Sequence, residues 1–128
     1  MLLIDKETMT IHLTRGDHAI LDITSEGDDG GVHKFEIGDV VCLKVMKATD
    51  YKDVVLQKQI EIKEETEVAT VELTSEQTKI GPVHYKAQKY HYEVELNRGG
   101  KVHTLVGYDK NGPKLLMLYP EGGDYDNG

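Results

Sequence analysis

The chain has 128 residues, the size of one domain, and can bury roughly two-thirds of the surface that its unfolded form exposes. The formal net charge of −8 argues against binding to nucleic acid or an anionic lipid surface, and no run of about 18 apolar residues predicts a membrane-spanning helix. Cys42 is the only cysteine, which excludes an internal disulfide and a zinc site made of several thiolates.

Alternation of apolar and polar residues predicts the strands of the first half of the chain. We expect strands at residues 9–14, 19–23 and 40–47, with a turn at 15–17 and an exposed, glycine-rich acidic loop at 25–31. The residues expected to face the core are Ile11, Leu13, Ala19, Leu21, Ile23, Val41, Leu43 and Val45, with Phe35 and Ile37 closing one end.

Two more strands, at residues 54–63 and 69–73, precede a short connection. Lys58 falls on the inward face of the first, which indicates an edge strand, a bulge or a crossing between two sheets. Residues 74–77 (TSEQ) have the spacing of a capping box and a Gly-Pro pair follows, so we expect one helical turn at 75–80.

The tyrosine-rich stretch from residue 89 to 108 predicts a β-hairpin. A two-residue loop, Arg98-Gly99, would place Lys101 and His103 among the inward tyrosines. We therefore expect a three-residue loop, Arg98-Gly99-Gly100, with Gly100 in the left-handed region. The resulting cross-strand pairs would be Leu96 with Val102, Val94 with Thr104 and Tyr92 with Val106.

The last expected strand, residues 114–119, is apolar on both faces, whereas a strand on a solvated sheet should alternate. We expect Leu116 and Leu118 to face outward and, with Ile20 or Leu105, to form a contact with another subunit. The alternative is that the apolar N-terminus (MLLI) folds back over them.

These elements predict one all-β domain at residues 1–120 and a disordered acidic tail at 121–128. About seven or eight short strands with regularly spaced turns indicate a β-sandwich or a barrel. The short helical turn before the tyrosine-rich strand favours an immunoglobulin-like antiparallel β-sandwich.

Residues 15–17 (RGD) spell the tripeptide that integrins bind, but short motifs need a confirming context. Nothing in the sequence indicates export to a cell surface. We therefore interpret the tripeptide as a turn, in which Gly16 takes a positive φ and Asp17 caps the backbone.

His91, Glu93, Glu95 and His103 form the one candidate metal set outside the acidic loop. In the expected register Glu95 lies opposite His103, but His91 lies too far along the ladder for one ion to reach both imidazoles. We expect a solvated polar face with a cross-strand His–Glu pair, and no metal.

The other polar groups give no sign of catalysis. Glu26, Asp28 and Asp29 lack the ligand spacing of a helix-loop-helix calcium site. Cys42 has no neighbouring base and is expected to be a buried thiol, and neither serine lies in a nucleophile-elbow sequence. We expect no enzymatic activity and no cofactor.

Three stretches carry a family resemblance: LTRGDHAILDI (13–23), IGDVVCLKV (37–45) and LTSEQTKIGPVHYKAQKYHYEVEL (73–96). Together they resemble small immunoglobulin-like proteins of phages and prophages of Gram-positive bacteria, similar to the N-terminal domain of phage baseplate upper proteins. The resemblance implies a baseplate, tail or head accessory protein, made in the bacterial host cytoplasm and incorporated into the virion. Its partners would be other virion proteins or further copies of itself. The alternative is a free-standing ligand- or carbohydrate-binding β-sandwich module.

Overall fold

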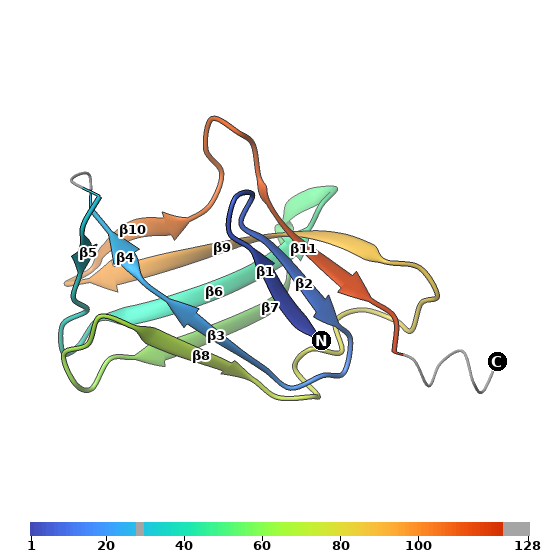
Figure 1. The fold of residues 1–128 in the computed structure, drawn as a ribbon, viewed down its shortest axis with the longest axis horizontal. Helices are drawn as coiled ribbons and strands as arrows, with labels where there is room; N and C mark the ends of the chain where they lie inside the picture. The colour runs from blue at the N-terminus through green and yellow to red at the C-terminus, as the bar shows by residue number, and fades with distance from the viewer. Residues whose placement is uncertain (28–29, 122–128) are drawn as a thin grey trace.

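The computed structural model describes residues 1–27 and 30–121, and these residues form strands and turns without a helix (Figure 1). The all-β class predicted from the sequence is therefore confirmed. The strands are β1 Leu2–Asp5, β2 Thr10–Thr14, β3 Ala19–Ile23, β4 Ser25–Glu26, β5 Val32–His33, β6 Val40–Lys47, β7 Asp50–Glu61, β8 Ala69–Leu73, β9 Gln88–Arg98, β10 Lys101–Val106 and β11 Lys114–Tyr119.

Seven strands form one large sheet in the order β1-β2-β11-β9-β6-β7, with β10 also paired to β9. One edge of β9 pairs with β6, and the other pairs first with β11 and then with β10. The β11–β2 pairing is parallel, so the sheet is mixed where a fully antiparallel one was expected. The N-terminal strand β1, which alternation did not predict, pairs with β2 at the sheet edge.

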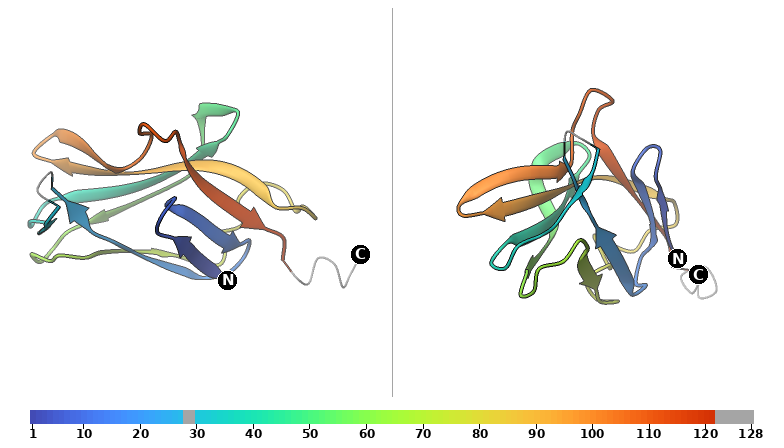
Figure 2. Two further views of the ribbon diagram at one scale, coloured as in Figure 1. Left: turned by 45° about the horizontal axis from the view of Figure 1, so that its top comes forward. Right: turned by 60° about the vertical axis from the view of Figure 1, so that its left-hand side comes forward.

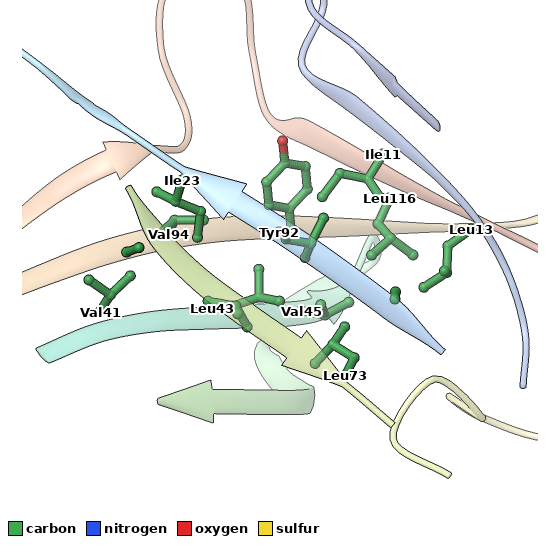
Figure 3. Packing of buried hydrophobic residues seen from close by; sticks show 14 of the residues in the cluster. Ile11, Leu13, Ile23, Val41, Leu43, Val45, Leu73, Tyr92, Val94 and Leu116 are labelled. Atoms are coloured by element: carbon green, nitrogen blue, oxygen red, sulfur yellow. The ribbon is translucent and has the colours of Figure 1, made fainter. Parts of the chain in front are cut away.

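Strands β3 and β8 form a second, two-stranded sheet that faces the large one across the core (Figures 1 and 2). Side chains from both sheets meet between them (Figure 3). The core residues expected from β2, β3 and β6 are buried. The inward row that alternation gives for β8 (Ala69, Val71 and Leu73) is buried too, as are Tyr92 and Val94, while Val106 is half-buried. Ile37 is 73% exposed, so that expectation was wrong, whereas Phe35 is fully buried and forms a β-bridge with Thr66.

The β9–β10 hairpin has a different register from the one expected. Arg98 pairs with Lys101 and His103 with Leu96, so the loop is the two residues Gly99-Gly100. Both glycines have positive φ, 59° and 81°, as a type I′ turn requires. A bulge between Thr104 and Val106 then restores an apolar residue opposite Val94.

The connection from β8 to β9 contains a hydrogen-bonded turn at residues 75–78 and no helix, so the expected helical turn is not confirmed. The capping-box hydrogen bonds are nevertheless present. The Thr74 N–H donates to Oε1 of Gln77 at 2.9 Å, and the Gln77 N–H donates to Oγ1 of Thr74 at 3.2 Å. The buried Thr78 hydroxyl donates to the Asp17 carbonyl at 2.8 Å and so ties the turn to the β2–β3 connection.

Two further expectations concern edges and loops. Lys58 lies on β7, which forms one edge of the large sheet, as its inward position indicated. The segment 25–31, expected to be a loop, contributes β4 to a short hairpin with β5. The predicted tail at 121–128 lies outside the described residues except for Glu121.

Candidate functional site

The residues expected to form a subunit contact do not share one surface. Leu116 and Leu118 are 1% and 0% exposed, because they lie on the inner side of β11 with Ile11 and Leu13 of the neighbouring β2. The outward assignment of both leucines was therefore wrong. Ile20 is exposed but belongs to β3 in the other sheet, and Leu105 is partly buried at the β10 bulge.

The RGD tripeptide forms the turn between β2 and β3. Nη1 of the buried Arg15 lies 2.8 Å from Oε1 of Glu121, and its Nη2 donates to the Gly81 carbonyl at 2.8 Å. Gly16 has a φ of 87°, and the Asp17 carboxylate pairs with the N-terminal amino group. The tripeptide is thus a turn with a positive φ at Gly16, as predicted, but the expected cap by the Asp17 side chain is not confirmed.

The candidate metal set is divided between the two faces of the large sheet. Glu95 lies opposite Thr104, whereas His103 lies opposite the buried Leu96. The expected His103–Glu95 pair is therefore wrong. Among the described residues, no three His, Cys, Asp or Glu side chains are grouped closely enough to hold a metal ion. The calcium candidates Asp28 and Asp29 lie outside the described residues.

The Cys42 thiol is buried on the outer side of β6, in a small hollow of about 180 Å³ that Gln57 and Gln59 also line. Burial raises the pKa of this thiol, and the nearby Lys44 ammonium only partly opposes that effect. The expectation of a buried thiol is confirmed, and a raised pKa keeps this thiol protonated at neutral pH.

Two carboxylates and one lysine lie side by side on the outer face of β6 and β9. Nζ of Lys44 lies 2.9 Å from Oε1 of Glu95, and this hydrogen bond is the main cause that lowers the pKa of Glu95. Burial raises the pKa of Glu93, and a hydrogen bond to Glu95 raises it further. The two glutamates therefore share a single ammonium group.

Next to these carboxylates, two connections enclose a hollow of about 410 Å³. One is the β6–β7 hairpin and the other is the excursion between β10 and β11; both project from the side of the large sheet opposite β3 and β8 (Figure 2, left). Tyr51, near the start of β7 in the first, is 71% exposed, and Tyr108, in the second, is 80% exposed. The lining residues are Met46, Ala48, Thr49, Tyr51, His91, Tyr92, Glu93, Tyr108, Pro113 and Lys114.

An apolar row continues from this hollow along the outer face of β11. Leu115 and Met117 are partly exposed there, and Tyr119 accepts or donates a 2.8 Å hydrogen bond with Nδ1 of His12. The His12 and Tyr119 rings are stacked, with centroids 5.8 Å apart. Leu3 of β1, 60% exposed, lies opposite His12. We call Leu3, Leu115, Met117 and Tyr119 the β11 row.

Neither the hollow nor the β11 row was predicted from the sequence, for identifiable reasons. Tyr51 lies near the start of β7 and Tyr108 lies between β10 and β11, and only the tertiary structure brings the two together. Tyr108 belongs to the stretch that was expected to form the hairpin, so alternation gave no sign that its ring is exposed. The β11 row was visible as apolar residues on both faces, but alternation could not say which face points outward.

Chemically, the outer face combines aromatic rings, carboxylates and partly exposed apolar side chains, which are groups suited to binding. Within residues 1–27 and 30–121, no helix is long and apolar enough to cross a membrane. The chain matches no family model, no curated protein and no solved structure.

Proposed function

We propose that this chain is a non-enzymatic interaction module that binds another protein through the outer face of its large sheet. The observation that carries the proposal is the β11 row, where Leu115 and Met117 face outward on a sheet whose core lies on the other side. The outer face of a solvated sheet should be polar, and a contiguous apolar patch commonly marks a protein–protein contact.

The strand pairing supports an immunoglobulin-like arrangement. In such sandwiches strands B and E share one sheet, whereas C, F and G share the other, which C′ can extend. The chain has β3 and β8 in one sheet, and β6, β7, β9, β10 and β11 in the other. The capped turn between β8 and β9 lies at the corresponding crossover.

The type of partner follows from the sequence resemblance alone. The three stretches at 13–23, 37–45 and 73–96 support a place in a phage or prophage particle, as a baseplate, tail or head accessory protein. The chain would then be made in the bacterial host cytoplasm and would act through contacts with other virion proteins or with copies of itself.

Particle composition tests this proposal. Particles purified after prophage induction of a strain that carries the gene should contain the wild-type chain, as detected by mass spectrometry. A Leu115→Lys, Met117→Lys variant should fold but be lost from the particles, because two ammonium groups cannot be buried in an apolar contact. Ile20→Lys, on the opposite sheet, is the matched control and should be incorporated. Particles that lack the wild-type chain would contradict the proposal.

A second candidate is a free-standing ligand- or carbohydrate-binding module. It is favoured by one observation, the two exposed tyrosines, Tyr51 and Tyr108, that line a single hollow. Binding of a neutral sugar that depends on both rings would support this candidate.

A further inference from the structure

The hollow between Tyr51 and Tyr108 is large enough to take a side chain of a partner. Its volume of about 410 Å³ is within the usual range of ligand sites. Met46 and His91 are paired across β6 and β9 and contribute to its lining. Both tyrosine rings are mostly exposed to solvent.

Among the described residues, Glu93 adds a carboxyl group beside the Lys44–Glu95 ion pair and forms no ion pair of its own. Glu93 and Glu95 share Lys44, whose Nζ is bonded to Glu95 at 2.9 Å. The buried Lys114 is already neutralised, because its Nζ lies 2.8 Å from Oδ2 of Asp109. A cation placed in the hollow would lie beside the Glu93 carboxyl group, and the net charge of −8 favours its approach.

The aromatic groups favour the same kind of ligand. The face of a tyrosine ring attracts an ammonium or guanidinium group that lies within about 6 Å of the ring centroid. Nζ of Lys52 lies 5.9 Å from the centroid of the Tyr51 ring, so this ring already attracts one ammonium group of the chain itself. The Tyr108 ring offers a second such face on the other connection.

The hollow is continuous with the β11 row, because His91 pairs directly with Leu115. A protein bound to the row would therefore present side chains at the hollow. We propose that the hollow receives a lysine or arginine side chain of the partner protein, between Tyr51 and Tyr108 and beside Glu93. This inference rests on the proposed interaction function and specifies the chemistry of the partner.

A titration with small probes tests the site on the intact protein. The probes are N-acetyl-arginine methylamide, N-acetyl-lysine methylamide and, as an uncharged control, N-acetyl-norleucine methylamide. At low salt, two-dimensional ¹H–¹⁵N NMR spectra should shift at the backbone amides that line the hollow with the two cationic probes only. We expect millimolar dissociation constants, which a single exposed cation–π and ionic contact can provide.

Variants assign the binding to the named groups. Glu93→Gln keeps the shape of the side chain and should weaken arginine-probe binding roughly 3- to 10-fold, and Tyr108→Ala should weaken it by a similar factor. Glu61→Gln and Tyr85→Ala change an exposed glutamate and an exposed tyrosine outside the hollow and should leave binding unchanged. Dispersed spectra of each variant show that it is folded.

Two results would overturn the inference. One is equal binding of the charged and uncharged probes. The other is preferential binding of a neutral sugar, such as methyl glucoside or N-acetylglucosamine, that Glu93→Gln does not affect. The particle assay distinguishes failure of this inference from failure of the proposed function. If the chain binds the cationic probes but is absent from the particles, the cation site is supported and the proposed place in a phage particle is contradicted.

Discussion

Asp39 is an almost fully buried carboxylate in the turn before β6, and Arg98 holds it from the end of β9. Nε of Arg98 donates to Oδ1 at 3.0 Å, and Nη2 donates to Oδ2 at 2.8 Å. The Glu36 N–H donates to Oδ2 at 2.8 Å. The Arg98 guanidinium and this N–H lower the pKa of Asp39 despite its burial.

Asp39→Asn should reduce the free energy of unfolding by about 1–2 kcal/mol at pH 7, because charge-assisted bonds are lost while the half-exposed Arg98 is resolvated. A lowered folded-state pKa stabilises the protein above the unfolded value, near 4, and this contribution disappears as the pH falls through the folded-state pKa. Urea unfolding from pH 7 to pH 3 should therefore show the two proteins converging in stability at acidic pH. Asp53→Asn, at an exposed pair with Lys47, is the control and should change stability by less than about 0.5 kcal/mol.

Cys42 provides a second prediction at the scale of the residue. Because burial both covers the thiol and raises its pKa, it should react very slowly with a disulfide reagent at pH 8 in the native protein. In urea the same thiol should react at the rate of a free cysteine. Rapid native-state reaction, followed by absorbance, would contradict the buried position on β6.

At the scale of the element, the β9–β10 turn depends on Gly99 and Gly100, both of which have positive φ. Gly100→Val should reduce the free energy of unfolding by about 1–2 kcal/mol, the usual left-handed penalty of a residue with a side chain. Gly99→Asn should be nearly neutral, because Asn-Gly is the preferred type I′ pair. Urea unfolding measures both, and a Gly100→Val protein as stable as wild type would exclude the left-handed conformation.

At the scale of the whole molecule, stability comes from the two sheets packing on one core. Val94 lies at the centre of that contact, on a strand paired on both edges (Figure 3). Val94→Asp should abolish cooperative thermal unfolding, because a buried unpaired carboxylate costs several kcal/mol. Val102→Asp is the matched control; Val102 is 57% exposed, so its melting should resemble wild type. Equal melting temperatures of the two variants would show that Val94 does not lie in the core.

The sequence by itself determined most of the strands and their inward faces. The bounds of β6 and β11 match the expected ranges, and Val41, Leu43 and Val45 are buried as alternation predicted. These properties are local. Apolar and polar residues alternate along each strand, and a strand with one buried face places the apolar residues on that face.

Tertiary structure decided what alternation leaves undetermined. A strand that is apolar on both faces, such as β11, does not itself determine which face points to the core. Its pairing with β2 and β9 decides this and buries Leu116 and Leu118. The bulge in β10 reverses which residues of that strand face the core. A prediction that assumes unbroken alternation along the strand therefore gives the wrong hairpin register. The hollow likewise exists only because strand pairing brings distant segments of the chain together. No single stretch of the sequence contains both of its walls.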